Sequence, residues 1–189
     1  MSGKILNFKD LQEKIKILKK RKKKIVLCHG VFDLLHVGHI KHLKKAKELG
    51  DKLIVTLTSD RHVNKGPGRP VFNQTLRSES IAAIDSVDYV VINDTPTAVS
   101  PIKIIRPNIY CKGKDYKNSS DDITGEIKNE TKEIKKIKGK IVFTEEMTFS
   151  SSRLINRSTD FFSPEQKKII NRISKKSNFK KIKQIIENF

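Results

Sequence analysis

The chain contains no tryptophan, only two cysteines and no long uninterrupted apolar run among its 189 residues. A membrane-spanning helix needs about 18 or more consecutive apolar residues, so the sequence offers no candidate for one. The N-terminal sequence MSGKILNFKD also lacks the apolar segment of a secretory signal. Cys28 and Cys111 are too few for a disulfide framework. We therefore expect a cytoplasmic protein with reduced thiols and no membrane partner.

Acidic residues are scarce, with 21 against 40 basic ones, and the resulting net charge of +19 is concentrated at the two ends of the chain. Residues 1–24 contribute +8 and residues 153–189 contribute +7, which leaves +4 for the stretch between them. Basic ends can bind nucleic acid, or they can steer anionic substrates by long-range attraction. A basic nucleic-acid-binding module is therefore the alternative from another class, although the weakly charged centre makes a nucleic-acid partner the less favoured reading. Removing both ends would distinguish the two hypotheses, because catalysis should persist whereas charge-driven binding should be lost.

The apolar pattern predicts an α/β protein. Helical periodicity covers residues 8–20, and short apolar runs alternate with helical segments after it. The predicted strands are 24–28, 52–58, 88–92, 108–111 and 140–143, and the predicted helices between them are 38–49, 73–84, 96–105 and 122–137. This alternation favours a Rossmann-like, doubly wound parallel sheet of five strands. We assign this domain to residues 1–157, with a further helix from 150 to 156, and a basic helical C-terminal extension to residues 158–189.

A group of histidines and glycines follows the first of these five predicted strands. His36 and His39 fall on one face at the start of the helix, where unpaired N–H groups and the helix dipole favour a phosphate. Gly38 lets a nucleotide approach the backbone closely. Two imidazoles beside phosphate oxygens can stabilise charge in phosphoryl or nucleotidyl transfer. Two alternatives remain: ordinary structural histidines, or a metal cluster formed by Cys28 with His29, His36, His39 and His42, which lacks an acidic ligand at suitable spacing.

Several motifs occur in the order found in one family of enzymes. They are Gly30-Val-Phe-Asp33, His36-Val-Gly-His39, Thr58-Ser-Asp60, Lys65-Gly-Pro-Gly-Arg-Pro70, Lys112-Gly-Lys-Asp-Tyr116 and Phe149-Ser-Ser-Ser152. Over residues 25–157 the chain resembles the cytidylyltransferase-like nucleotidyltransferases. Within them it is most similar to the adenylyltransferase module of ADP-heptose synthases and to related modules fused to ribokinase-like sugar kinases. The HxGH pattern also resembles class I aminoacyl-tRNA synthetases, but the chain lacks their second, lysine-containing signature loop.

The resemblance implies transfer of a nucleoside monophosphate, with ATP as the favoured donor, to a sugar 1-phosphate such as D-glycero-D-manno-heptose 1-phosphate, with release of pyrophosphate. The alternative within the family is a CTP:glycerol-3-phosphate (or other phospho-alcohol) cytidylyltransferase, whose usual Arg-Thr-x-Gly is replaced here by Glu145-Glu-Met-Thr148. Mg²⁺ is expected with the triphosphate, held chiefly by phosphate oxygens and water, and no protein metal site is expected. A homodimer is also implied. If the chain is complete, a separate sugar kinase would supply its substrate.

The resemblance also assigns roles to individual residues. The expected catalytic residues are His36, His39 and Lys65. The expected nucleotide-binding residues are Gly30, Val31, Phe32, Asp33, Gly38, Gly113, Asp115, Ser150, Ser151 and Ser152. The expected acceptor-binding residues are Asp60, Arg69 and Arg77. Several of these residues have a simpler alternative: a helix cap for Asp33 and the serines, a solvated side chain for Lys65, a turn for Asp115, and surface salt bridges for the two arginines.

Overall fold

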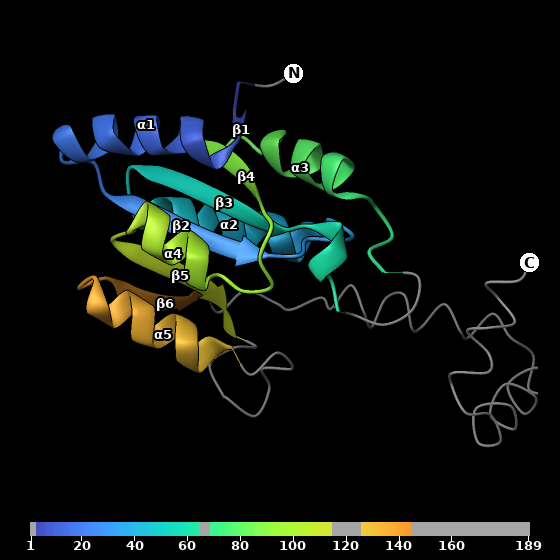
Figure 1. Ribbon diagram of the computed structural model, residues 1–189. Helices are drawn as coiled ribbons and strands as arrows, with labels where there is room; N and C mark the ends of the chain where they lie inside the picture. Colours follow the sequence, from blue (N-terminus) through green and yellow to red (C-terminus); the bar gives the residue numbers. More distant parts are fainter. Residues whose placement is uncertain (1–2, 65–68, 115–125, 145–189) are drawn as a thin grey trace, which may run out of the picture. The chain divides into compact units, whose positions relative to one another are not determined.

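The computed structural model describes residues 3–64, 69–114 and 126–144 (Figure 1). These residues all belong to one compact unit of the chain, residues 1–151. Several sequence predictions lie outside the described residues: Lys65, Asp115, the three serines at 150–152, the helix from 150 to 156, and the extension 158–189. They stay predictions.

A parallel sheet forms the centre of the domain, as the sequence predicts. Its strands are β1 (Ile5–Leu6), β2 (Ile25–Gly30), β3 (Lys52–Thr58), β4 (Tyr89–Asn93), β5 (Ile109–Gly113) and β6 (Lys140–Thr144). They are arranged in the order β1-β4-β3-β2-β5-β6, and every pairing is parallel. Within the described residues the prediction of five strands is corrected to six. The strand that the sequence did not predict is β1, which has two residues, too few to produce a periodic signal, and pairs at the edge with β4.

Helices cover both faces of the sheet (Figure 1). The helices are α1 (Phe8–Lys20), α2 (Val37–Glu48), α3 (Gln74–Ala82), α4 (Val99–Ile105) and α5 (Ile127–Lys136). Side chains of α2 and α3 share one apolar core with Val26 and Cys28 of β2, whereas α1, α4 and α5 share the other with Ile25 and Leu27. This alternation along β2 is what a strand buried on both faces requires. None of the described helices is long and apolar enough to cross a membrane.

The basic N-terminal helix is part of the folded domain. Asn7 caps α1 by accepting the N–H of Asp10, and Leu11, Ile15 and Leu18 are buried against the sheet. Removing residues 1–24 would therefore expose one of the two cores. Substituting exposed lysines is consequently a better test of charge-driven binding than the truncation that the sequence suggests.

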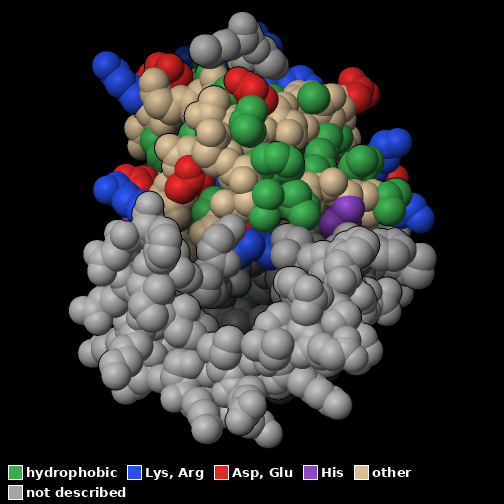
Figure 2. Space-filling view, turned by 90° about the vertical axis from the view of Figure 1, so that its right-hand side faces the viewer, with side chains coloured by type: hydrophobic (Ala, Val, Ile, Leu, Met, Phe, Trp, Pro, Cys, Tyr) green, Lys and Arg blue, Asp and Glu red, His purple; other side chains and the backbone are tan. Residues whose placement is uncertain are grey.

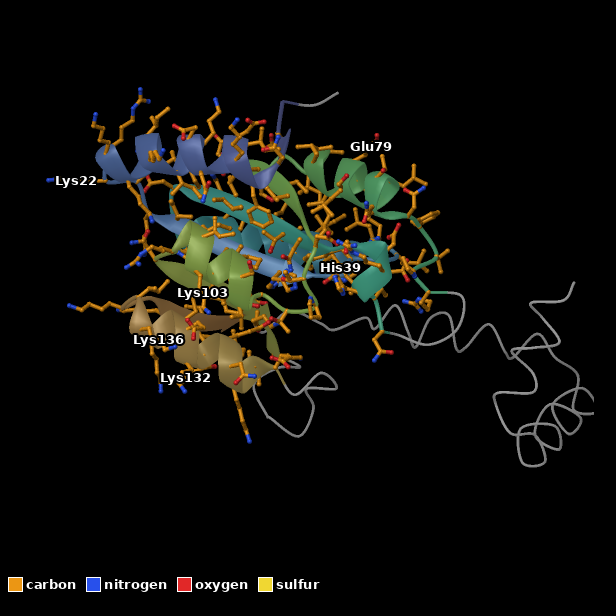
Figure 3. The ribbon with its side chains drawn as sticks, viewed as in Figure 1. Lys22, His39, Glu79, Lys103, Lys132 and Lys136 are labelled. Atoms are coloured by element: carbon orange, nitrogen blue, oxygen red, sulfur yellow. The ribbon has the colours of Figure 1, made fainter. Side chains whose placement is uncertain are left out.

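The strand order reverses at β2, because β3 and β4 lie on one side of it and β5 and β6 on the other. In parallel α/β sheets, ligands bind beyond the carboxyl ends of the strands at such a reversal. The turn from β2 into α2 lies there. Figure 3 shows His39 near this end of the sheet, with Lys22 at the opposite end and Lys103, Lys132 and Lys136 on the α4–α5 side. Most of the labelled lysines are thus remote from His39.

Candidate phosphate-binding site

The turn after β2 is held in an unusual backbone conformation. Phe32 has φ of 49°, in the left-handed region, which costs a non-glycine residue about 1–3 kcal/mol. Its ring is 8% exposed and packs edge-on against His39, with 5.3 Å between ring centroids. A Cβ at Gly30 would lie 3.1 Å from the Phe32 ring, so glycine leaves room for it. The turn is therefore fixed by packing before any ligand arrives.

The two histidines of the HxGH motif cap α2 together. His36 is the N-cap residue, and its Nδ1 accepts the N–H of Gly38 at 3.1 Å. The Nδ1 atom of His39 accepts the N–H of His36 at 3.4 Å, and the two rings stack with centroids 3.8 Å apart. Because each Nδ1 is an acceptor, each neutral ring carries its proton on Nε2. The pair therefore supplies two N–H donors at the start of the helix.

The electrostatic setting of this helix end favours an anion. Burial lowers the pKa of His36 below its ordinary value, which keeps the ring neutral and preserves its acceptor role in the cap. The first turn of α2 contains no acidic residue. The positive end of the helix dipole and two imidazole rings thus come together at the start of α2, an arrangement suited to phosphate oxygens.

Asp33 joins the β2–α2 turn to the segment that follows residue 68. Its buried carboxylate accepts from Arg69 Nε at 2.5 Å and from the backbone N–H groups of Val71 at 2.7 Å and Phe72 at 3.2 Å. Because His36 occupies the N-cap position, Asp33 is not a helix cap. The carboxylate instead fixes residues 69–72 beside the site.

Arg69 presents an unused donor at this place. Its side chain is 6% exposed and its Nε is paired with Asp33. Its Nη2 is buried without a hydrogen-bond partner among the residues that the structure describes. A buried guanidinium N–H left in this way is costly unless an acceptor completes it. The geometry therefore suits a ligand oxygen.

Arg77 lies fully inside the protein. Its guanidinium donates to the carbonyls of Phe72, Val31 and Thr58 and to the Asp60 carboxylate, over distances from 2.5 to 3.0 Å. The side chain is 0% exposed, so the alternative of a surface salt bridge is wrong. With these contacts Arg77 ties the ends of β2 and β3 to the start of α3. These contacts give Arg77 a positioning role, and a direct contact with an acceptor phosphate stays a prediction.

Asp60 lies at the edge of an open pocket beyond β3 and β4. The pocket has a volume of about 550 Å³ and is lined by Ser59, Asp60, Arg61, Gln74, Ile92 and Asp94. Asp60 accepts the N–H of Gln74 at 3.0 Å in addition to its contact with Arg77. Hydroxyl, amide and carboxylate groups thus meet at this surface.

Gly113 ends β5, the strand next to β2. A Cβ at this position would meet no atom within 4 Å, so the chain itself does not require glycine there. Its neighbour Lys112 is buried, with Nζ 3.4 Å from Glu130 and 5.5 Å from the centre of the Tyr110 ring. Sequence reasoning missed this buried ion pair, whose partners are 18 residues apart and follow no motif.

The histidines do not assemble into the metal cluster considered from the sequence. His29 lies 2.9 Å from Thr56 Oγ1 and 3.4 Å from Thr58 Oγ1, whereas His36 and His39 cap the helix. His42 lies instead beside Cys28 and Cys111, and the sequence does not predict Cys111 as a member of the cluster.

Replacing Asp33 with asparagine should release residues 69–72. The amide has one acceptor oxygen where the carboxylate has two, and its NH₂ group would face N–H donors. Hydrogen exchange of a peptide spanning Val71 and Phe72 should accelerate by about tenfold or more, because a hydrogen bond to a charged group stabilises by about 1.5–3 kcal/mol. The matched control is Asp94→Asn, a half-exposed carboxylate paired with Arg61. Equal exchange in the wild type and Asp33→Asn would contradict this role of Asp33.

Stability should fall in mild acid. Burial, aided by the charge of Lys112, lowers the pKa of His29 to about 3 and that of His42 to about 4. The unfolded chain therefore binds more protons below the ordinary histidine pKa of about 6.5. The free energy of unfolding should decrease as pH falls from there toward 4, by up to about 1.4 kcal/mol per pH unit for each ring. Urea unfolding at pH 7 and pH 5 measures this decrease, and His29→Gln should reduce it. The same stability at both pH values would be inconsistent with two rings that the fold keeps neutral.

Known proteins resemble this chain in sequence and in architecture. The cytidylyltransferase-like family matches residues 27–158. The bifunctional protein HldE of Nitratiruptor sp. is 44% identical over 138 residues, which are 72% of this chain and 30% of that protein. HldE of Aliarcobacter butzleri is 41% identical over 139 residues, or 72% of this chain and 29% of its own length. The chain thus spans less than a third of these relatives.

Solved structures agree with the fold. The lipopolysaccharide core biosynthesis protein of Thermoplasma volcanium superimposes with a TM-score of 0.54 at 28% identity, covering 67% of this chain and 99% of that one. Pantoate–β-alanine ligase of Francisella tularensis gives a TM-score of 0.58 at 19% identity, over 89% and 77% of the two chains, and shows likeness of fold alone. With the family matched across most of the chain and the HxGH histidines at the strand-order reversal, this chain belongs to the cytidylyltransferase-like family of nucleotidyltransferases.

Proposed function

We propose that the chain transfers a nucleoside monophosphate from a nucleoside triphosphate, with ATP favoured, to a sugar 1-phosphate such as D-glycero-D-manno-heptose 1-phosphate. The observation that carries this proposal is the paired cap of α2, in which His36 and His39 keep Nε2–H donors at a helix N-terminus. The sugar acceptor is supported by the resemblance to ADP-heptose synthase modules and by the 41–47% identity to HldE proteins. The lipopolysaccharide-related neighbour points in the same direction.

The reaction is an in-line displacement at the α-phosphorus. An oxygen of the acceptor phosphate forms the new bond, the bond from the α-phosphorus to the bridging oxygen breaks, and pyrophosphate leaves with that electron pair. The acceptor oxygen is already anionic, so the step requires no general base. The protein contributes positioning and charge stabilisation: the positive end of α2 and both imidazoles toward the α- and β-phosphates, and Arg69 Nη2 toward a phosphate oxygen.

Mg²⁺ enters as part of the substrate, bound to the triphosphate. Asp33 and Asp60, the carboxylates placed beside the site, already accept from arginine and backbone donors. Phosphate oxygens and water, the usual magnesium ligands in such complexes, then supply the coordination. Lys65, Gly113, Asp115 and the serines at 150–152 are proposed as further substrate contacts on the strength of the resemblance.

The pocket beside Asp60 suits the sugar end of the acceptor. Its hydroxyl, amide and carboxylate groups match a ligand with several hydroxyl groups. A sugar 1-phosphate must itself come from a kinase reaction, and we propose that a sugar kinase, on this chain or a separate one, supplies it.

Product analysis over a matrix of substrates tests the function. ATP, CTP, GTP and UTP are each incubated with Mg²⁺ and with heptose 1-phosphate, another sugar 1-phosphate or glycerol 3-phosphate. Mass spectrometry then identifies any nucleotide conjugate. An ADP-sugar formed from ATP and heptose 1-phosphate is the expected result. Formation of CDP-glycerol alone would establish the alternative, a CTP:glycerol-3-phosphate cytidylyltransferase. Absence of any conjugate, together with absence of nucleotide binding, would overturn the proposal.

We also propose a homodimer. Val71, Phe72 and Leu76 are 44–49% exposed, and Figure 2 shows hydrophobic side chains gathered on one face, with a histidine at their margin. A second subunit would cover such a surface. Light scattering coupled to size exclusion should give twice the mass of 21.6 kDa for the wild type and a smaller mass for Phe72→Glu. A monomeric wild type would contradict the proposal.

A further inference from the structure

Two cysteines and a histidine meet beneath the α2 helix. Cys28 of β2 and Cys111 of β5 are direct partners on neighbouring parallel strands, and both are fully buried on the side of the sheet that α2 covers. His42 projects from α2, three residues after His39. The two sulfur atoms and one ring nitrogen of His42 all lie within 4.8 Å of one another. The cluster therefore joins three elements at the point where the strand order reverses.

His42 has a hydrogen-bond partner outside the cluster. Its Nδ1 lies 2.7 Å from Thr144 Oγ1, and this hydroxyl in turn donates to the carbonyl of Lys112 at 3.5 Å. When the Thr144 hydroxyl donates to this carbonyl, it accepts from His42 Nδ1–H, and Nε2 then keeps its lone pair. Histidines that bind metals are held in this way, with the other ring nitrogen donating to a protein group.

The charge balance also suits a metal. Burial lowers the pKa of His42 to about 4, so this ligand is neutral without losing a proton. Burial raises the pKa of the Cys28 thiol, against the opposing charge of Lys112, so the metal-free thiol is protonated. A divalent ion that displaces the two thiol protons would leave two thiolates and a 2+ ion, with no net charge in an apolar core.

We propose that Cys28, His42 and Cys111 form a binding site for Zn²⁺, separate from the magnesium that accompanies the triphosphate. Two sulfurs and one imidazole nitrogen form a soft ligand set that favours zinc over magnesium or calcium. Tetrahedral coordination, with bonds of about 2.3 Å to sulfur and about 2.0 Å to nitrogen, requires ligand atoms roughly 3.5–3.8 Å apart. A closure of about 1 Å within the present cluster achieves that spacing. His42 is half-buried, so this ligand is in part accessible from solvent, and water would complete a four-coordinate site.

Cobalt titration tests the site directly. The untagged full chain is reduced, freed of metal with a chelator, shown to have two free thiols, and titrated with Co²⁺. Thiolate-to-cobalt absorption in the near ultraviolet, saturating at one ion per chain and removed by Zn²⁺, is the expected result. No such absorption from a chain with both thiols free would overturn the proposal.

Three variants locate the ion. Cys111→Val replaces the thiol with an apolar, β-branched side chain that suits a strand, and it should abolish the absorption. Thr144→Val removes only the outer hydrogen bond and should weaken zinc affinity about 10–100-fold in a competition assay. His62→Gln, outside the cluster, should change neither the cobalt absorption nor the zinc affinity. Thermal unfolding confirms that each variant is folded. An unchanged cobalt spectrum in a folded Cys111→Val protein would overturn the proposal. If Cys111→Val does not fold, a zinc affinity of Thr144→Val equal to that of the wild type would overturn it.

Discussion

Replacing His39 with alanine should lower turnover about 100-fold or more, the usual loss for one donor that stabilises transition-state charge. In the proposed mechanism the ring supplies an Nε2–H to the phosphates, and in the structure it accepts the N–H of His36 and packs against Phe32. Alanine removes all three contacts, so the expected loss contains both a catalytic and a structural part. Steady-state pyrophosphate release with saturating ATP and heptose 1-phosphate measures the sum.

Asparagine separates the two parts. In His39→Asn, the side-chain oxygen lies near the place of Nδ1 and still accepts the N–H of His36, but no donor reaches the place of Nε2. The variant should retain stability close to that of the wild type while losing activity nearly as severely as the alanine variant. His62→Asn, on the short helix Asp60–His62, is the matched histidine control. Activity of His39→Asn within a few-fold of the wild type would show that the phosphates are bound elsewhere.

Replacing Arg77 with methionine should destabilise the protein by about 3–5 kcal/mol, the range for breaking a buried charged network by removing one partner. Three backbone carbonyls would lose their donor and Asp60 would lose its ion pair, while the methionine chain fills much of the volume. Urea unfolding measures this difference in the free energy of unfolding. The slope of that free energy against urea concentration should be the same in the variant and the wild type.

Arg61→Met is the control for this loss. Arg61 pairs with Asp94, but its side chain is 67% exposed, and exposed pairs contribute about 0–1 kcal/mol. A loss below 1 kcal/mol in Arg77→Met, accompanied by a higher KM for the acceptor, would instead support the direct phosphate contact that the sequence predicted for Arg77.

The elements of the fold could be predicted because each is specified by nearby residues. The helix at 8–20 and the strand at 52–58 coincide with α1 and β3, since their apolar periodicity is unbroken. The strand β1 could not be found, because two residues carry no period and its pairing with β4 connects positions 85 residues apart. The HxGH motif is likewise contiguous in the sequence, so its residues His36 and His39 could be assigned to the start of a helix.

The partners of the charged side chains could not be predicted. Arg77 bonds to Val31, 46 residues away, and Asp33 bonds to Arg69, 36 residues away, so both contacts depend on how the loops after β2 and β3 meet. The sequence also could not show that the two histidines cap the helix with Nδ1, the detail that sets their tautomers. The assembly of Cys28, His42 and Cys111 requires the strand order itself, which places β5 beside β2.

The destination of the α-phosphorus tests the central claim most directly. ATP labelled with ³²P at either the α- or the γ-phosphate is incubated with Mg²⁺, heptose 1-phosphate and the full chain, and the products are separated. The account predicts that the α-label appears in the nucleotide-sugar and the γ-label in pyrophosphate, and that both products are lost in His39→Asn. A γ-label on the sugar would show a kinase reaction, and an α-label that His39→Asn transfers as fast as the wild type would show that the reaction takes place away from the HxGH histidines.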